Sequence, residues 1–361
     1  MTGTLSDRDT RAGHPAVRRI GAGPLLLGLT AALVVAILLG AIIGQVPVSP
    51  AEVFGSLMHK IGLPIGPLPS HPQGDSTLWT VRFPRVSLAV LVGAGLGCSG
   101  ALMQGVFGNP LAEPGVIGVS SGAAVGAFTV IVFGLSALGG WTVVLAAFLC
   151  GMGTALLVYF LSRSGGRAET VTLILTGIAV NAFTGAVIGL LTFLSDDDAL
   201  RAMAFWNLGS LSGANWQAVG LVGLCTAAGI GVGLGHGRAL DLLSLGDGAA
   251  RHLGVEVERV RLRLVVVVAL LVSAGVAFTG VIAFIGLVVP HVIRMLAGPG
   301  HRLLLPASCL GGGLVLALAD LVARTVVPYQ ELPLGILTAL VGGPFFFILL
   351  MRTRARSGGW S

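Results

Sequence analysis

The stretch LVVVVALLVSAGVAFTGVIAFIGLVV, residues 264–289, runs for 26 positions without a charged residue. A transmembrane helix needs about 20 apolar residues, and at 1.5 Å per residue a helix of this length would extend about 39 Å. One such helix would fit the bilayer only with a marked tilt. The alternative is two shorter spans, with a break near Gly280. The choice decides whether the chain crosses the membrane nine or ten times.

The composition of the 361 residues is that of an integral membrane protein. Hydrophobic residues make up 55% of the chain and charged residues 10%, and the mean hydropathy is +0.95. Soluble domains carry about 25% charged residues, because a surface in water needs them. Soluble enzymes, nucleic-acid-binding proteins and disordered scaffolds are therefore excluded. The 56 glycines favour close packing of helices in lipid.

Apolar runs predict a single membrane-spanning domain, residues 23–351, between tails at 1–22 and 352–361 that we expect to be cytoplasmic. The apolar part of the first run exceeds the 7–15 residues of a signal-peptide core, so we expect a retained span. The outer segment 45–81 holds six prolines and is expected to be irregular. The predicted spans are residues 23–44, 86–106, 116–137, 139–161, 170–194, 215–235, 262–279, 281–297, 305–323 and 333–351.

The placement of basic residues favours ten spans over nine. With ten spans, sixteen of the 21 Lys and Arg residues lie on one side of the membrane. With nine, the last two basic clusters change sides and the asymmetry is lost. Cytoplasmic loops are enriched in Lys and Arg. The sequence therefore predicts an all-α protein of the cell membrane with ten transmembrane helices and both termini in the cytoplasm.

The chain lacks the groups that would supply energy for transport. Lys60 is its only lysine and does not belong to a nucleotide-binding P-loop. The deep spans contain almost no titratable residues, whereas proton-coupled carriers usually show several. The histidines, cysteines and carboxylates show no metal-site spacing. We therefore expect the energy to come from a partner protein. A secondary transporter driven by an ion gradient is the alternative, and an intramembrane enzyme is a more distant one.

The inner segment, residues 236–261, sets leucines among charged residues. It predicts two short helices separated by Gly246, the second capped by Asp247 and ended by Gly254. Such a compact pair favours docking of a partner protein. The alternative is an amphipathic linker that lies on the lipid surface.

Several motifs, in this order, resemble those of the FecCD-type permeases over roughly residues 79–351. One departure is that Gly280 is followed by Val281, where the family often has proline. The matching motifs are RFPR (82–85), GALMQG (100–105), NPLAEPG (109–115), GVSSGA (118–123), LSLG (243–246), LGV (253–255), FIGL (284–287), PHVIR (290–294), ADLVAR (319–324), ELPLG (331–335) and GPFF (343–346).

The resemblance implies a membrane subunit of an ATP-driven ABC importer for an iron–siderophore complex, haem or cobalamin. It implies three kinds of partner: a cytoplasmic ABC ATPase dimer, an extracytoplasmic substrate-binding protein, and a second permease subunit, identical or homologous. ATP would bind the ATPase, so this chain itself is expected to be neither an enzyme nor the holder of a cofactor. The resemblance assigns coupling to the ATPase to Leu242, Leu243, Leu245, Gly246, Ala249, Ala250, Leu253 and Gly254.

The resemblance also implies that arginines near the outer mouth pair with acidic residues of the binding protein. The matching positions are Arg82, Arg85 and Arg324. Each has a structural alternative. Arg82 and Arg85 flank a span entry and could snorkel to the interface. Arg324 follows Asp320 by four residues, a spacing that permits an ion pair within one helix.

Overall fold

The computed structural model describes residues 20–164, 167–327 and 330–356. This part contains seven helices that are long and apolar enough to cross a membrane, and three shorter apolar helices. The prediction of an all-α membrane protein with ten spans is confirmed. The seven long apolar helices are α1 (Ala22–Ile42), α4 (Phe83–Phe107, continuous with α3, Gly74–Thr77, and the π-helical turn η1, Leu78–Arg82), α6 (Trp141–Leu161), α7 (Thr170–Leu194), α9 (Trp216–Gly235), α12 (Val257–Thr279) and α14 (His301–Ala323). Three have shorter apolar stretches: α5 (Val119–Val132), α13 (Ile285–Ala297) and α15 (Leu334–Arg356).

Shorter elements connect these spans. The segments predicted to lie outside hold α2 (Pro50–Lys60) and α8 (Asp197–Leu208), and the segment predicted to lie inside holds α10 (Gly237–Leu243) and α11 (Asp247–His252). A 3₁₀ turn, η2 (Pro114–Ile117), precedes α5. Strands β1 (Arg163–Ser164) and β2 (Arg167–Ala168) pair antiparallel between α6 and α7.

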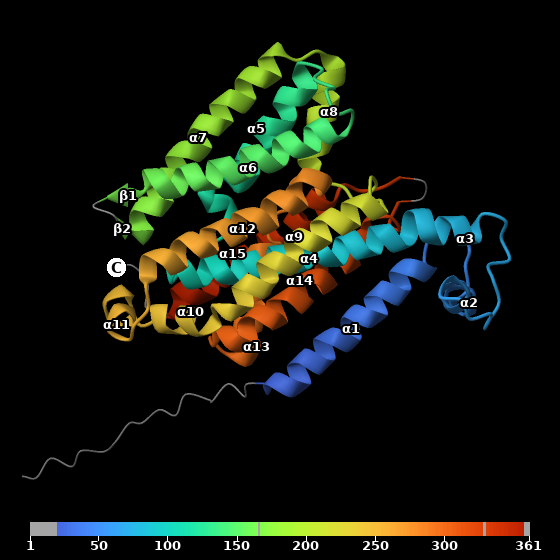
Figure 1. The fold of residues 1–361 in the computed structure, drawn as a ribbon, viewed down its shortest axis with the longest axis horizontal. Coiled ribbons are helices and arrows are strands. Elements are labelled where there is room, and N and C mark those ends of the chain that lie inside the picture. The colour runs from blue at the N-terminus through green and yellow to red at the C-terminus, as the bar shows by residue number, and fades with distance from the viewer. Residues whose placement is uncertain (1–19, 165–166, 328–329, 357–361) are drawn as a thin grey trace, which may run out of the picture.

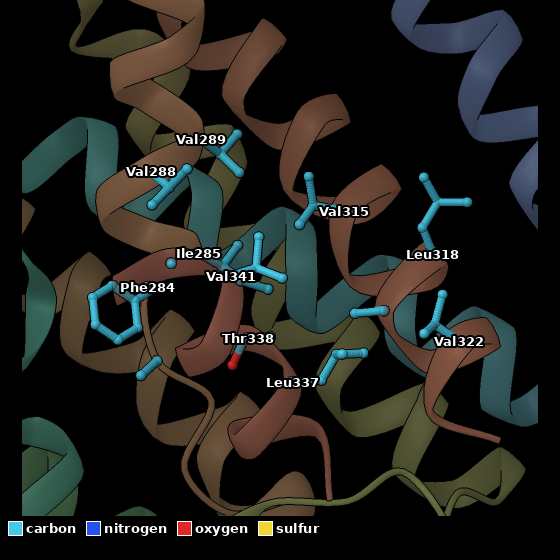
Figure 2. Close-up of a pocket in the computed structure, with 13 residues that line it drawn as sticks. Phe284, Ile285, Val288, Val289, Val315, Leu318, Val322, Leu337, Thr338 and Val341 are labelled. Carbon is cyan, nitrogen blue, oxygen red and sulfur yellow. The ribbon is translucent and has the colours of Figure 1, made fainter. Parts of the chain in front are cut away.

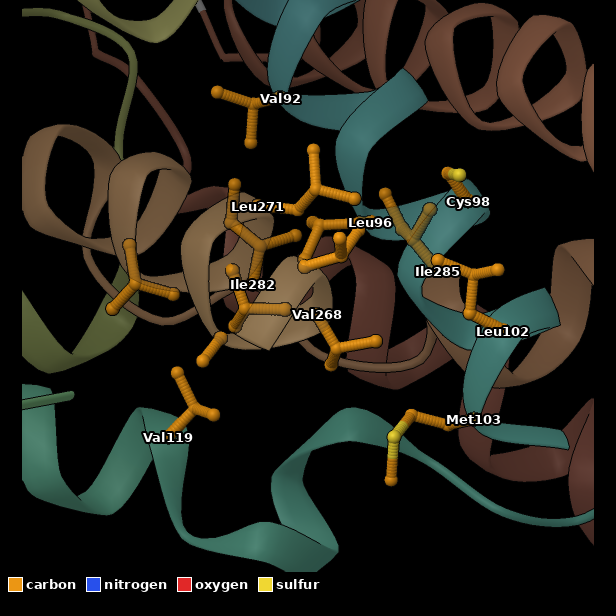
Figure 3. Close-up of a cluster of buried hydrophobic side chains, with 14 of the residues drawn as sticks. Val92, Leu96, Cys98, Leu102, Met103, Val119, Val268, Leu271, Ile282 and Ile285 are labelled. Atoms are coloured by element: carbon orange, nitrogen blue, oxygen red, sulfur yellow. The ribbon is translucent and has the colours of Figure 1, made fainter. Parts of the chain in front are cut away.

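The helices form a bundle around α4 (Figure 1). Helix α14 lies along α4, and α9, α12 and α13 also pack against α4. Helices α5, α6 and α7 form a layer on the far side of α12, and α1 packs on the edge of α14. Figure 3 shows the core where these layers meet, with Leu96 and Leu102 of α4 facing Val268 and Leu271 of α12 and Ile285 of α13.

Glycine allows the backbones of α4 and α14 to touch. A Cβ atom on Gly93 would overlap the carbonyl oxygen of Gly312, and one on Gly97 would overlap the carbonyl oxygen of Ser308. Small residues at a helix interface in lipid permit this close approach, and van der Waals packing then holds the helices together. Helices α4 and α14 are therefore expected to move as one body.

Several helix boundaries differ from those predicted. Helix α5 is shorter than the predicted span 116–137, because Gly118 and Gly134 on either side have positive φ. Helix α12 begins at Val257 rather than 262, so it includes the end of the segment predicted as a cytoplasmic connection. The break after Thr279 extends to Phe284, and α13 begins at Ile285 rather than 281. Phe284 (φ 69°) is the only non-glycine residue with positive φ in the described part of the chain.

The outer segment is more regular than predicted, because α2 forms within it. Pro50 occupies its first turn, where proline needs no hydrogen-bond partner. Ser49 and Glu52 form a capping box, in which the Glu52 N–H donates to Ser49 Oγ (3.3 Å) and the Ser49 N–H donates to Glu52 Oε2 (2.7 Å). The Ser70 N–H donates to the other carboxylate oxygen at 2.7 Å and so joins the following loop to α2.

This arrangement predicts an acid-sensitive outer segment. Hydrogen bonds from the Ser49 and Ser70 backbone lower the pKa of Glu52 from 4.5 to about 2. A carboxyl group with a lowered pKa stabilises the fold above its unfolded pKa, and this contribution is lost as the pH falls toward the folded value. We expect the wild type to lose more thermal stability than Glu52→Gln between about pH 5 and pH 3. Equal losses in melting temperature in detergent would contradict this assignment.

Candidate functional site

Polar and exposed groups that could serve transport gather at the two ends of the bundle. At the inner end, residues 237–254 form a protrusion that we call the inner knob. At the opposite end, a set of side chains that we call the outer charge cluster lies between α1, α4 and α14; its members are Arg82, Arg85, Asp320, Arg324 and Glu331. Figure 1 shows α10 and α11 of the inner knob together at the end of the bundle from which α12 begins.

The inner knob consists of two short helices joined at a glycine. Gly246 has φ 98°, a conformation that favours glycine, and it turns the chain between α10 and α11. Leu245 beside it is 63% exposed, and Leu253 at the end of α11 is 58% exposed. Asp247 does not cap α11 as predicted. Its carboxylate instead lies 2.9 Å from Arg261 Nη2 and links the inner knob to α12.

The eight predicted coupling residues differ in their burial. Five lie at the surface of the inner knob, and Leu242 is half-buried. Leu243 and Ala250 are buried in the core, so they hold the inner knob against the bundle and do not face a partner. For these two, the predicted position at a contact surface is wrong. The five exposed residues are Leu245, Gly246, Ala249, Leu253 and Gly254.

The inner knob is also bonded to the first residue of α14. Asp241 Oδ1 accepts a hydrogen bond from the backbone N–H of His301 at 2.7 Å and contacts His301 Nδ1 at 2.8 Å. These residues are 60 positions apart, and neither belongs to one of the motifs quoted above. Sequence reasoning missed this contact.

In the outer charge cluster, Arg85 forms two ion pairs. Its Nε lies 2.8 Å from Asp320 Oδ1, and its Nη1 lies 2.6 Å from Glu331 Oε1. The side chains of Arg85 and Asp320 are only 7% and 1% exposed. Arg324 Nε lies 3.6 Å from the other oxygen of Asp320, which confirms the pair predicted within the helix. The cluster thus connects α4, α14 and the start of the last span.

Two arginines of the cluster also bind the end of α1. Arg82 donates through Nη1 to the carbonyl oxygens of Ala41 (2.8 Å) and Ile42 (2.9 Å), and through Nη2 to that of Val46. Arg324 donates to the carbonyl oxygens of Gly40 (2.6 Å) and Ile43 (3.0 Å). The last carbonyls of a helix have no partner within it, and cations stabilise this end.

Arg82 and Arg85 are buried, and Arg324 is half-buried. Arg82 and Arg85 point into the bundle, so the alternative in which they snorkel to the interface is wrong. Their placement gives each a structural role, and docking of a binding protein through them stays a prediction. A pocket of about 190 Å³ reaches them from the outer end, between residues 44–46 and Thr77 and Val81.

A second pocket, of about 270 Å³, lies between α13, α14 and α15 (Figure 2). Thr338 contributes the only polar side chain of its lining, and Phe284, Val288 and Val341 line it with apolar groups. Such a surface suits a lipid chain or an apolar helix rather than a charged ligand. Among the described residues, no group of three or more His, Cys, Asp or Glu side chains could hold a metal ion.

Comparisons with known proteins agree with this architecture. A family model described as the FecCD transport family matches residues 32–352. The hemin transport system permease protein of Yersinia pestis is 46% identical over 286 residues, which cover 78% of this chain and 85% of the relative. The vitamin B12 import system permease protein of Klebsiella pneumoniae is 36% identical over 333 residues, which cover 92% and 94%.

A solved structure is similar over nearly the whole chain. It is described as an inward-facing conformation of a metal-chelate type ABC transporter, and it superposes with a TM-score of 0.80 at 33% sequence identity. The match covers 91% of this chain and 99% of that chain. Both the inner knob and the outer charge cluster lie within the residues that the family model matches.

Proposed function

Because the chain belongs to the FecCD transport family and is an ABC importer permease, we propose that it carries a metal chelate such as haem, cobalamin or an iron–siderophore complex into the cytoplasm. The observation that carries this proposal is the 46% identity to a hemin permease over most of both chains. The vitamin B12 permease and the metal-chelate transporter support the same class of substrate. Haem, cobalamin and iron–siderophore complexes are all metal chelates rather than free ions.

We propose that the inner knob docks on a cytoplasmic ATPase dimer, which binds and hydrolyses ATP. Leu245 and Leu253 support this, because two strongly exposed leucines on a compact protrusion suit insertion into a cleft of a partner. A second permease subunit, identical or homologous, completes the transporter. We infer from the distribution of basic residues that the inner knob and both termini lie on the cytoplasmic side of the cell membrane.

Uptake by the reconstituted complex tests the proposal. The permease, its ATPase and its binding protein are placed in proteoliposomes, and uptake of haemin, cobalamin and a ferric siderophore is measured with and without ATP. We expect ATP-dependent accumulation of one of these chelates and none without the ATPase. Accumulation by the permease alone, driven by an ion gradient, would favour a secondary transporter and overturn the proposal.

We propose that the binding protein docks at the outer charge cluster by inserting an acidic side chain into its pocket. Three arginines against two carboxylates leave the cluster with an excess of one positive charge. Arg82, Arg85 and Arg324 line the inside of the pocket, and the exposed Gly44 and Gln45 lie at its edge. A carboxylate that enters would meet guanidinium groups already held in place by the bundle.

Closing the pocket mouth tests this docking without disturbing an ion pair. We expect Gln45→Trp to weaken binding of the binding protein at least tenfold, about 1.4 kcal/mol, because the indole fills the entrance. The matched control is Gln73→Trp, at an exposed position of the same outer segment that does not line the pocket. Affinity is measured in nanodiscs at low salt. Unchanged affinity for Gln45→Trp, or equal losses in both variants, would rule out the pocket as the docking site.

A further inference from the structure

The contact between Asp241 and His301 joins two parts of the molecule that have different roles. Asp241 lies on α10 of the inner knob, and His301 is the first residue of α14. One carboxylate oxygen of Asp241 accepts from the His301 N–H at 2.7 Å and contacts His301 Nδ1 at 2.8 Å. His301 is buried, whereas the Asp241 side chain is 37% exposed. The bond therefore anchors a surface helix to a buried helix end.

Helix α14 depends on this contact for its first turn. Gly300, which precedes the helix, has no side chain to cap it, so Asp241 supplies the cap from another element. Pro306 follows one turn later and has no N–H to donate to the carbonyl oxygen of Arg302. The beginning of α14 thus has fewer internal hydrogen bonds than an ordinary helix end, and its position is sensitive to that of Asp241.

Beyond this first turn, α14 is fixed to α4. The glycine contacts at Gly93 and Gly97 bring the two backbones together near mid-helix, and the ion pair between Arg85 and Asp320 joins them near the outer end. A displacement of α14 along its length must therefore carry α4 with it. The outer charge cluster lies at the other end of the α4–α14 helix pair, and it also holds the end of α1.

The surroundings of the contact are loosely packed and polar. A pocket of about 260 Å³ lies between α10, the end of α4 and the turn before α14. Three buried polar atoms of its lining residues have no hydrogen-bond partner among the described residues: Gln104 Oε1, Arg294 Nη1 and His301 Nε2. This space lies on the side of α10 that carries Asp241, whereas Leu240 and Leu243 pack the helix into the core. The Asp241 bonds add to this packing a polar link from α10 to the first residue of α14.

We propose that the Asp241–His301 contact is the joint through which movement of the inner knob passes to the α4–α14 pair and so to the outer charge cluster. This inference rests on the proposed function, in which the inner knob docks on the ATPase. Asp241 is a positioning residue in this scheme, because it acts on transport through α14. The second link of the inner knob, from Asp247 to Arg261, spans only 14 positions and reaches the helix that directly follows the inner knob.

The test measures how many substrate molecules enter per ATP hydrolysed by the reconstituted complex. A structural defect lowers the amount of active transporter and leaves this ratio unchanged. We expect Asp241→Ala to keep the ATPase bound and its basal hydrolysis within twofold, but to lower the ratio at least tenfold. Asp241→Asn retains a side-chain oxygen that accepts both bonds, so it should keep more than half of the wild-type ratio.

The matched control is Asn215→Ala, which removes the side-chain cap of another span, α9, within a single element. Its ratio should equal that of the wild type. If Asp241→Ala does not assemble, His301→Phe is measured instead. This variant keeps the backbone bond and the ring volume but loses Nδ1. A lowered ratio in His301→Phe supports the joint, and an unchanged ratio overturns it. A wild-type ratio in Asp241→Ala also overturns it. Absence of ATP-dependent uptake by the wild type would instead refute the proposed function.

Discussion

Leu245→Asp is expected to abolish ATP-driven uptake and to release the ATPase from the purified permease, while the permease itself stays folded in the membrane. Leu245 is 63% exposed at the tip of the inner knob, so a carboxylate there is solvated in the free chain and costs little stability. In an ATPase cleft the same carboxylate would lose water without gaining a partner, which costs several kcal/mol. Co-purification of the ATPase and uptake into proteoliposomes measure the two effects.

Two further variants show whether the loss of uptake comes from the surface of the inner knob or from its packing. Leu245→Met keeps an apolar side chain of similar volume and should transport like the wild type. Leu243→Ala changes a buried leucine two positions away and should lower the melting temperature of the permease, at a cost of about 2–5 kcal/mol. Normal uptake by Leu245→Asp would show that the inner knob does not enter a cleft and serves only as a connection.

The sequence predicted the spans best where polar residues flank an apolar run of ordinary length. The predicted span 170–194 coincides with α7, and 215–235 differs from α9 by one residue. It was less accurate where backbone conformation ends a helix inside an apolar stretch. Residues 281–284 are as apolar as the helices around them, and the positive φ values of Gly280 and Phe284 depend on tertiary contacts. The length of the apolar run predicted a break near Gly280, but hydropathy contains no signal for its extension to Phe284.

The candidate sites, like the spans, could be predicted from the sequence only in part. The two helices of the inner knob followed from the turn at Gly246, but the burial of Leu243 did not follow from its being one of several leucines. Helical geometry could have found it, because Leu240 and Leu243 are three positions apart and share one face of α10. The pair between Arg85 and Asp320 was out of reach, since 235 positions separate these residues and only the packing of α14 on α4 brings them together.

Replacing Arg85 by methionine is expected to destabilise the permease by about 3–5 kcal/mol. Methionine fills much of the space of the arginine stem, so the loss is chiefly electrostatic. Asp320, 1% exposed, would keep only the longer contact with Arg324, and Glu331 would lose its partner. Removal of one partner of a buried ion pair leaves an uncompensated charge, which is the source of a loss of this size. Unfolding in mixed micelles of detergent and SDS measures it.

A double variant identifies the cause of this loss. In Arg85→Met with Asp320→Leu the buried carboxylate is gone as well, and replacing both charges of a buried pair by apolar groups is often neutral or stabilising. We therefore expect the double variant to recover more than half of the stability that Arg85→Met loses. Arg201→Met is the control, because Arg201 is an exposed arginine of α8 whose replacement should change stability by less than about 0.5 kcal/mol. If the double variant is as unstable as Arg85→Met, the loss does not come from an unpaired Asp320. It would then come from the contacts that Arg85 makes with the start of the last span, and Glu331→Gln should reproduce it.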